Sequence, residues 1–328
     1  MNLLVTGGAG FIGSNFVRHM LYTYPNIAIV NLDLLTYAGT LCSLADLKDN
    51  PRHKFVHGSI TNRELVTYLL DVHNIDGIVN FAAESHVDRS IVNPGAFVET
   101  NVQGTLVLLE AAKEKRIGRF VHISTDEVYG SLGEAGYFTE DSPITPNSPY
   151  AASKAASDML VRSYYKTYGL DVNITRCSNN YGPYQFPEKL IPLLITNGVD
   201  GESLPVYGDG ENIRDWIHVK DHCAAIDLIL QKGKKGEVYN IGGRTEKTNN
   251  EISQIIMEEL KLPKERLKYV KDRPGHDRRY AVNPEKLEKE LGWKPTYSFE
   301  TGIKETVDWY LSYESWWRPL KERVHAGK

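Results

Sequence analysis

Short apolar segments and longer amphipathic segments alternate through the first half of the chain. Helix-like residues 11–24, 62–73 and 94–116 lie between apolar segments, which we interpret as strands at residues 1–7, 27–35, 54–60, 77–83, 119–125 and 170–179. A strand, helix, strand order of this kind predicts an α/β fold, in which helices cover both faces of a parallel sheet. Ligands of such doubly wound sheets bind at the carboxyl ends of the strands, so residues that directly follow a strand are the first candidates for a site.

The second half of the chain has a looser pattern. From about residue 179 it becomes rich in Pro, Gly, Tyr and Asn. We therefore predict a first domain over residues 1–178, to which the chain returns near 215–245 and 283–310. Most of residues 179–328 would form a smaller, interleaved lobe.

The last segment, residues 310–328, predicts a helix followed by a frayed tail. We expect the adjacent Trp316 and Trp317 to pack in the protein interior and not to bind a ligand.

Composition narrows the possible partners and the location. A formal net charge of -4 with mixed signs does not indicate the basic surface that binds nucleic acid. No apolar run approaches the roughly 20 residues that cross a bilayer, and residues 1–11 lack a basic leader and a cleavable apolar segment. We therefore expect a cytosolic protein with no membrane association. Cys42, Cys177 and Cys223 are odd in number and widely spaced, which predicts reduced thiols and no structural metal.

A glycine-rich turn follows the first predicted strand and opens the first predicted helix. Gly8, Gly10 and Gly13 fit the pattern Gly-x-Gly-x-x-Gly, and Gly7 adds a second spacing. Glycines at these positions allow a tight turn and let a diphosphate approach the N–H groups at the start of the helix. Asp33 ends the second strand about 20 residues later, where its carboxylate can accept a hydrogen bond from a ribose 2′-hydroxyl. The pattern predicts a Rossmann-type domain that binds NAD in preference to NADP, since the acid would repel a 2′-phosphate.

Two further motifs carry reactive side chains. Tyr150 and Lys154 lie four residues apart at the start of a predicted helix, hence on one face. A lysine ammonium near a phenol favours the phenolate, so we expect the lysine to lower the pKa of the tyrosine and make it a base. Thr125 ends the strand at 119–125, and Asp126 and Glu127 directly follow it, where the two acids either face a ligand or only cap the next turn.

Several motifs together resemble a known family. The stretches "GGAGFIG", "STDEVYG" and "YAASK" resemble the extended short-chain dehydrogenase/reductase family. Within it, "LDLLTYAG", "FAAESHVDRSI", "SNNYGPYQFPEKLIP", "VYGDGENIRDWIHVKDH" and "DRPGHDRRYA" resemble the dTDP-glucose 4,6-dehydratases of bacterial rhamnose-type sugar pathways, from residue 7 to about 281. The resemblance implies NAD as cofactor and dTDP-glucose as substrate. It also implies a homodimer, formed through the long helices that begin near Pro94 and Tyr150, although the small and apolar residues of these helices could equally pack on the sheet.

The resemblance also implies a role for each reactive residue. Tyr150, assisted by Lys154, would take the proton of the hydroxyl on carbon 4 while NAD accepts the hydride, and Thr125 would hydrogen-bond that oxygen. The resulting ketone acidifies the hydrogen on carbon 5, which Glu127 would remove as base. Asp126, held protonated, would protonate the hydroxyl that leaves carbon 6. The two neighbouring acids must then have different pKa values, for which like charge and partial burial are the usual causes.

Binding residues are carried over by position from the same resemblance. The cofactor contacts implied are Gly7, Gly10, Phe11, Ile12, Gly13, Asp33, Leu34, Leu35, Thr36, Ser59, Ile60, Ala82, Ala83, Ser85, Thr100, Tyr150, Lys154 and Asn180. The substrate contacts implied are Ser85, Thr125, Asn179, Lys189, Leu190, Pro205, Tyr207, Arg214, Asn249, Arg273 and His276. Arginine forks match phosphate oxygens, which suits Arg214 and Arg273 to a nucleoside diphosphate.

One position departs from the family pattern. Ser59 stands where the family usually has an aspartate that meets the amino group of adenine. A serine hydroxyl can still accept a hydrogen bond, so we expect a weaker contact and the same cofactor. His86 and Asp88 are a further candidate pair, for which positioning of their loop is the simpler interpretation.

Two other functions share parts of this pattern. A nucleotide-sugar 4-epimerase or decarboxylase on the same scaffold would use Tyr150 and NAD, but is expected to lack the adjacent acids. A non-catalytic NAD-binding regulator would keep the glycine turn and lose the proton-transfer groups. The intact Thr125, Asp126, Glu127, Tyr150 and Lys154 favour the dehydratase.

Overall fold

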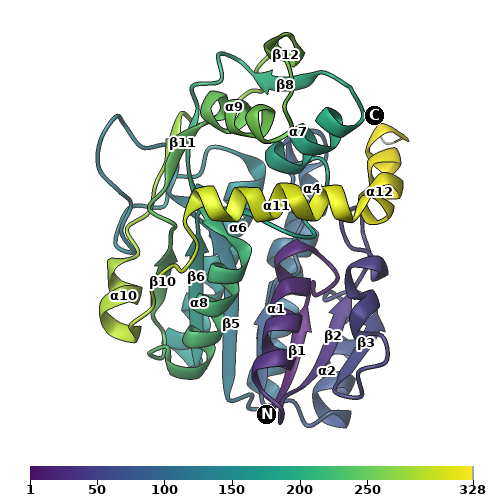
Figure 1. Ribbon diagram of the computed structural model, residues 1–328. Helices are drawn as coiled ribbons and strands as arrows, with labels where there is room; N and C mark the ends of the chain where they lie inside the picture. The colour runs from purple at the N-terminus through teal and green to yellow at the C-terminus, as the bar shows by residue number, and fades with distance from the viewer. Residues whose placement is uncertain (327–328) are drawn as a thin grey trace.

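The computed structural model describes residues 1–326, and within that range seven strands form one parallel sheet (Figure 1). The predicted doubly wound fold and its six strands are confirmed, and a seventh strand comes from the second half of the chain. In sheet order the strands are β10 (Val238–Ile241), β6 (Val172–Cys177), β5 (Arg119–Thr125), β4 (Gly77–Asn80), β1 (Asn2–Thr6), β2 (Ala28–Asp33) and β3 (His53–His57). The order reverses at β1, which places a crevice at the carboxyl ends of β1 and β4.

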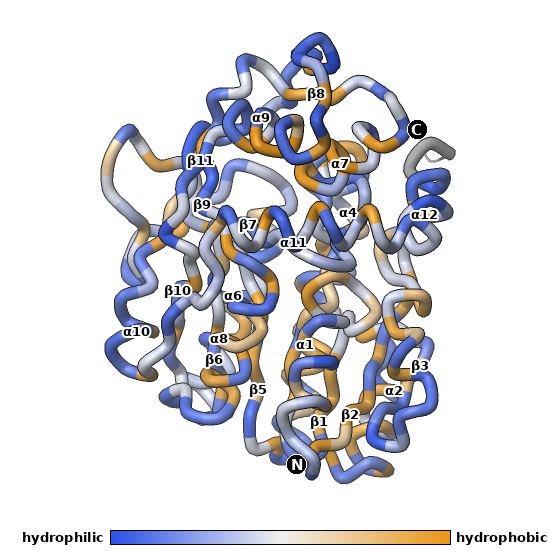
Figure 2. The backbone as a smooth tube through the Cα atoms, viewed as in Figure 1, coloured by the Kyte–Doolittle hydropathy of each residue, from blue (hydrophilic) through white to orange (hydrophobic). Residues whose placement is uncertain are grey.

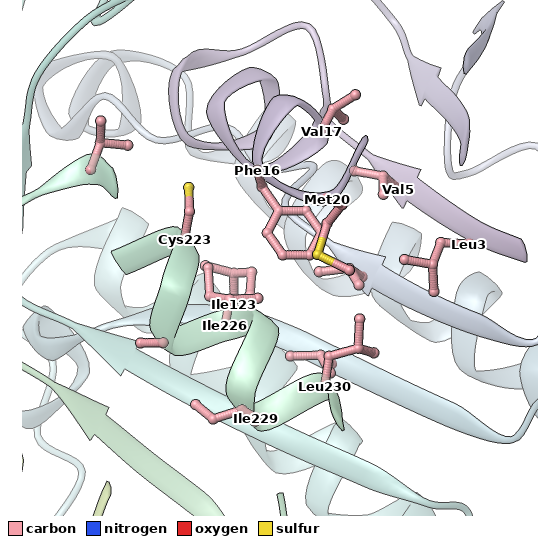
Figure 3. Close-up of a cluster of buried hydrophobic side chains, with 14 of the residues drawn as sticks. Leu3, Val5, Phe16, Val17, Met20, Ile123, Cys223, Ile226, Ile229 and Leu230 are labelled. Carbon is pink, nitrogen blue, oxygen red and sulfur yellow. The ribbon is translucent and has the colours of Figure 1, made fainter. Parts of the chain in front are cut away.

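The strands are apolar along their length because both faces of the sheet are covered. Side chains alternate across a strand, so Leu3 and Val5 of β1 enter one core while Leu4 enters the other. The first core packs α1 (Phe11–Thr23) and α8 (Val219–Lys232) on the sheet, and Figure 3 shows Phe16 of α1 beside side chains of α8. The second core packs α2 (Arg63–Val72), α5 (Thr105–Glu114) and α6 (Pro149–Tyr168). In Figure 2 the buried strands β1 and β5 are correspondingly hydrophobic.

The helix predicted at residues 94–116 is not uniform. It comprises α4 (Pro94–Phe97), the π-helical segment η2 (Val98–Gly104) and α5. Wider turns of this kind occur mostly as single insertions and frequently at functional sites. Here the segment carries Asn101, whose buried amide bonds both the N–H and the carbonyl of Glu84 at 2.9 and 3.0 Å. The segment therefore fixes the loop that follows β4.

Helix α6 is defined by its sequence at both ends. The Ser148 hydroxyl accepts a hydrogen bond from the N–H of Ala151 at 3.1 Å, and Pro149 occupies the first helical position. Gly169 ends the helix in the left-handed conformation, with φ of 67°. These caps fix the start of the helix, where Tyr150 and Lys154 lie.

The smaller lobe lies above the carboxyl ends of the central strands (Figure 1). A mixed sheet contains β7 (Asn179–Tyr181), β9 (Ile213–His218), β11 (Glu246–Thr248) and β13 (Arg279–Tyr280), and β8 (Leu204–Tyr207) pairs with β12 (Leu267–Val270). The helices α7 (Leu190–Val199) and α9 (Asn249–Glu259) pack with β9 around a core of their own. This lobe forms a cover over the crevice of the large sheet.

Segments of the second half of the chain also belong to the large sheet or pack on it. Both α8 and β10 belong to it, and α10 (Glu285–Leu291) packs on them. The predicted return near residues 283–310 divides, however, because α11 (Phe299–Ser312) packs on α7, β9 and α9 of the smaller lobe. Phe299, Ile303 and Tyr310 are apolar on one face of α11 and join that lobe's core.

The chain ends in α12 (Glu314–Ala326), where Trp316 and Trp317 are buried, as predicted. The last two residues of the predicted frayed tail, 327 and 328, lie outside the described residues. Across residues 1–326 we find no helix that is both long enough and apolar enough to span a bilayer. In the same range no cluster of three metal-ligating side chains occurs, and Cys42, Cys177 and Cys223 are free.

Candidate active site

A cavity of about 320 Å³ opens at the carboxyl ends of the central strands, beneath the smaller lobe. It brings together most residues that the sequence nominated. The nominated residues that line it are Gly7, Gly10, Phe11, Ile12, Gly13, Asp33, Leu34, Thr36, Ser59, Ile60, Ala82, Ala83, Ser85, Thr100, Thr125, Asp126, Glu127, Tyr150, Lys154, Asn179, Asn180 and Lys189. Cofactor and catalytic candidates from distant parts of the chain therefore share one cavity.

The glycine turn leaves space that side chains would fill. At Gly7, whose φ is +70°, a Cβ atom would lie 2.6 Å from the backbone nitrogen of Ala82. A Cβ on Gly13 would lie 2.8 Å from the Cα of Gly8, so the helix can begin this close to the turn only with glycine. Helix α1 starts at Phe11 and presents its N-terminal N–H groups beside the cavity. This geometry suits a diphosphate.

Asp33 lies where a ribose-binding acid is expected, at the end of β2. Its carboxylate accepts hydrogen bonds from the N–H groups of Ala9 and Leu35 at 2.9 and 2.8 Å. Burial raises the pKa of Asp33, and the two backbone donors oppose that rise. Leu35 itself turns away with a φ of 53° and packs on the first core, so it is not part of the cavity wall.

The two adjacent acids follow β5 in a short 3-10 turn, η3 (Asp126–Tyr129). The Thr125 hydroxyl caps this turn by accepting from the N–H of Glu127 at 3.3 Å. Asp126 is almost fully buried, and its Oδ2 has no hydrogen-bond partner among the described residues. An unpaired carboxylate in that setting would cost far more free energy than a protonated acid. The pKa of Asp126 is correspondingly well above its ordinary value because of burial and then the charges of Glu127 and Asp215, with Arg214 opposing.

Glu127 has different surroundings from its neighbour. Burial also raises its pKa, but three cations oppose the rise: Arg273, Lys189 and then Arg214. All three come from the smaller lobe. Asp126 therefore holds its proton more strongly than Glu127, which is the division that an acid and a base require.

Tyr150 and Lys154 lie on one face of α6, as their spacing predicts, and both are buried. The ammonium of Lys154 donates to the carbonyl of Ile123 at 2.7 Å, and burial lowers its pKa to about 8. The expected lowering of the Tyr150 pKa is wrong for this structure. Burial and then the charge of Glu127 raise the pKa of Tyr150 well above 10, and only the hydrogen bond with Thr125 opposes them. Loss of solvent is thus the largest cause of the raised pKa of Tyr150.

The substrate candidates of the smaller lobe fall into two sets. In the first, Tyr207 donates to Asp88 at 3.2 Å, Arg273 lies 3.5 Å from the same carboxylate, and the ring of His276 packs edge-on against Tyr207. Asp88 thus holds two of them, and it does not pair with His86, which faces Glu188 at 3.7 Å.

The second set is tied to the backbone. Lys189 donates to the carbonyl of Ser85 at 3.1 Å, and Arg214 donates to the carbonyl of Asp277 at 2.9 Å while it stacks over the Tyr280 ring at 4.3 Å. Leu190, Pro205 and Asn249 lie outside the cavity wall, in α7, β8 and the first turn of α9 respectively. Four other nominated residues also lie outside that wall: Tyr207, Arg214, Arg273 and His276.

Several cavity residues escaped the sequence reasoning. They include Tyr37, Gln185, Phe186 and Glu188. Glu188 is the neighbour of a nominated residue, Lys189, in a Pro-rich loop, and that adjacency was an available signal. Tyr37 likewise adjoins the nominated Thr36, and its ring is held under the Arg89 guanidinium at 4.0 Å.

Comparison with known proteins agrees with this geometry. The model of the GDP-mannose 4,6 dehydratase family matches residues 4–306. A dTDP-glucose 4,6-dehydratase of Xanthomonas campestris pv. campestris (strain B100) is 56% identical, with 95% of this chain and 94% of that protein covered. The chain belongs to the dTDP-glucose 4,6-dehydratase family. Its relative from Streptomyces niveus is 53% identical, with 99% and 97% covered.

Solved structures give the same result for the fold. The dTDP-glucose 4,6-dehydratase of Bacillus anthracis, solved in complex with NAD, has a TM-score of 0.92 and 55% identity, covering 98% of this chain and 99% of that one. The Streptomyces venezuelae enzyme, also with NAD bound, has a TM-score of 0.95 and 54% identity, covering 98% and 100%. A UDP-glucose 4-epimerase of Thermotoga maritima is more distant, at 31% identity and a TM-score of 0.89 over 95% and 99%.

Proposed function

We propose that this protein is an NAD-dependent dTDP-glucose 4,6-dehydratase, which converts dTDP-glucose to dTDP-4-keto-6-deoxyglucose and water. The observation that carries the proposal is the contrast between Asp126 and Glu127 within the cavity of the glycine turn. An oxidoreductase or an epimerase needs only the cofactor and a base such as Tyr150. Elimination of water needs an acid and a base together, and this cavity provides one of each.

The residues present fit NAD. The turn at Gly7, Gly10 and Gly13 would hold the diphosphate at the start of α1, and Asp33 would accept from a ribose hydroxyl. NAD, when bound, supplies a hydride acceptor that returns the same hydride later in the cycle. The Asp33 carboxylate disfavours the 2′-phosphate of NADP.

In the first step Tyr150 accepts the proton of the carbon 4 hydroxyl. Its high pKa in the buried cavity makes it a strong base once it has ionised, and Lys154 carries a compensating positive charge one helical turn away. The Thr125 hydroxyl, already next to Tyr150, is placed to hold the same substrate oxygen. The product of this step is a 4-keto sugar, whose hydrogen on carbon 5 is acidic.

In the second step water leaves across carbons 5 and 6. The Glu127 carboxylate takes the carbon 5 proton, and the freed electron pair forms the carbon 5 to carbon 6 double bond as the carbon 6 to oxygen bond breaks. Asp126 gives its proton to the departing hydroxyl, so that it leaves as water. The cations Arg273, Lys189 and Arg214 oppose the raised pKa of Glu127 and so favour its carboxylate form.

The test is incubation of the protein with dTDP-glucose, followed by assay of the alkali-sensitive chromophore of 4-keto sugars. We expect the chromophore to form. Formation of dTDP-galactose without the ketone would instead establish a 4-epimerase, and no turnover of any sugar nucleotide would favour a regulator. UDP-glucose in parallel tests base choice, where one methyl group is worth only about 1 to 3 kcal/mol.

A cytoplasmic homodimer is part of the proposal, and its product would feed deoxysugar synthesis of the rhamnose type. Free Cys42 at the surface is typical of a reducing compartment. Val98 of η2, Leu106 of α5 and Met159 of α6 are exposed apolar side chains on helices that pack together. Such a patch suits a two-fold interface between copies. Light scattering should give the mass of two chains.

A further inference from the structure

The cavity follows the carboxyl ends of the strands in sheet order. It is lined at successive strand ends by Thr125 after β5, Ala82 after β4, Gly7 after β1, Asp33 after β2 and Ser59 after β3. The inference rests on the proposed function, in which the nicotinamide meets the sugar near β5, the diphosphate meets the glycine turn, and a ribose meets Asp33. The remaining end, beyond β3, then receives the adenine of the dinucleotide.

Ser59 is held in a defined position at that end. Its carbonyl accepts from the N–H of Asn62 at 3.1 Å, and Asn62 caps α2 by accepting from the N–H of Leu65 at 3.0 Å. Next to Ser59, Ile60 is buried against η2, where a Cβ on Gly104 would collide with it. The hydroxyl therefore projects from a rigid turn and not from a mobile loop.

The Ser59 hydroxyl takes part in two hydrogen bonds. It accepts from the N–H of Thr61 at 3.1 Å and lies 2.7 Å from the Thr61 hydroxyl, where either oxygen can be the donor. A hydroxyl has one proton and two lone pairs. When Ser59 donates to Thr61, it keeps one lone pair for a ligand. When Thr61 donates to Ser59, the proton of Ser59 is free for a ligand instead.

Both arrangements preserve the two hydrogen bonds between Ser59 and Thr61, so exchange of one arrangement for the other costs little free energy. Adenine offers an amino group that donates, and hypoxanthine offers a keto oxygen at the same position that accepts. A carboxylate has no proton to donate, so it could bind the amino group of adenine but not the keto oxygen of hypoxanthine. Among the described residues that line the cavity, the acids are Asp33, Glu84, Asp126, Glu127 and Glu188, and none of them follows β3.

We propose that Ser59, paired with Thr61, makes this dinucleotide site accept a 6-keto purine as readily as a 6-amino purine. Nicotinamide hypoxanthine dinucleotide would then bind about as tightly as NAD. An aspartate at this position would reject the keto purine, because it would face a carbonyl oxygen with no proton between them.

The experiment is competition on the full-length protein. The purified protein is equilibrated with an equimolar excess of NAD and nicotinamide hypoxanthine dinucleotide, freed of unbound ligand, denatured, and assayed by chromatography for the ratio retained. We expect a ratio within about threefold of one. Ser59→Asp should shift the ratio toward NAD by about tenfold or more, since an unpaired buried polar group costs roughly that factor or more. Ser59→Asn is the matched control, because its amide can turn to donate or accept, and its ratio should stay near one.

Three results would overturn the inference. A tenfold preference of the parent protein for NAD would show that the hydroxyl does not adapt. An unchanged ratio in Ser59→Asp would show that this side chain does not meet the base. Retention of neither dinucleotide would overturn the inference together with the proposed function, whereas retention of NAD alone would leave the proposed function intact.

Discussion

Replacement of Glu127 by glutamine should separate oxidation from elimination. The substitution keeps the size of the side chain and removes its ability to take a proton. Glu127 is the largest charge that raises the pKa of Tyr150, after burial. Loss of that charge eases ionisation of Tyr150, so oxidation at carbon 4 should persist in Glu127→Gln.

The size of the effect on elimination follows from the role of a general base. Positioned proton transfer contributes about 10² to 10⁴-fold to a rate, which corresponds to a barrier about 3 to 5 kcal/mol higher. We expect the upper part of this range. In the parent protein Arg273, Lys189 and Arg214 favour the charged form of Glu127. The glutamine amide is uncharged and cannot accept the proton, so this stabilisation is lost in the variant.

Two measurements on Glu127→Gln check this reasoning. Absorbance of reduced cofactor should build up after dTDP-glucose is added, because oxidation continues and the return of hydride is blocked. Exchange of the carbon 5 hydrogen with deuterated water, followed by NMR, should fall by at least about a hundredfold. Exchange at the parental rate would refute the assignment and require another base.

The matched variant is Asp126→Asn, which removes the acid and leaves the base. Carbon 5 exchange should continue in this variant, whereas formation of the 4-keto-6-deoxy product should fall by about 10² to 10⁴-fold. Equal loss of carbon 5 exchange in both variants would mean that proton removal requires both acids. The assignment of Glu127 as the base and Asp126 as the acid would then be wrong.

Three further predictions concern the cofactor, stability and assembly. Gly13→Ala should abolish retention of NAD in the purified protein, because its Cβ would lie 2.8 Å from backbone, whereas Gly133→Ala, with nothing within 4 Å, should retain it. Lys154→Met should be inactive yet more stable at neutral pH. The Lys154 pKa is about 8 in the fold against 10.5 when exposed, so stability of the parent rises with pH through that window. Calorimetry should show a gain of about 3 kcal/mol at neutral pH that vanishes at high pH; a constant difference would contradict it. Leu106→Glu combined with Met159→Glu should give a single-chain mass in light scattering, and an unchanged mass would exclude this patch as the interface.

The large sheet could be predicted because its signals are local. Six apolar segments, a glycine turn after the first, and an acid after the second sufficed for the fold and the cofactor end. The strands of the smaller lobe could not be predicted from local signals, because β11 has three residues and β13 only two. Strands this short are defined by pairing with the distant β9, which no local pattern encodes. The π-helical turn of η2 was missed for a similar reason, because it depends on contacts of Asn101 with the loop after β4.

The candidate site was predictable in its residue types and less so in its electrostatics. The catalytic candidates share one cavity, but the direction of the Tyr150 pKa was wrong, because spacing along a helix reveals a nearby charge and not the loss of solvent. Glu188 and Tyr37 were missed because both are placed by tertiary contacts. Seven substrate residues carried over from the resemblance lie outside the cavity wall and remain predictions: Leu190, Pro205, Tyr207, Arg214, Asn249, Arg273 and His276.

The separation of acid from base depends on the smaller lobe. Asp126 and Glu127 are adjacent in one short turn, so their own strand cannot give them different surroundings beyond the direction in which each points. Arg214 opposes protonation of both acids, so the difference arises from Arg273 and Lys189, the two cations that act most strongly on Glu127, and both belong to the smaller lobe. Arg273 is in turn held at 3.5 Å by Asp88 of the large domain. The proton affinity of the proposed base therefore depends on cations of the smaller lobe and not only on the turn that carries Glu127.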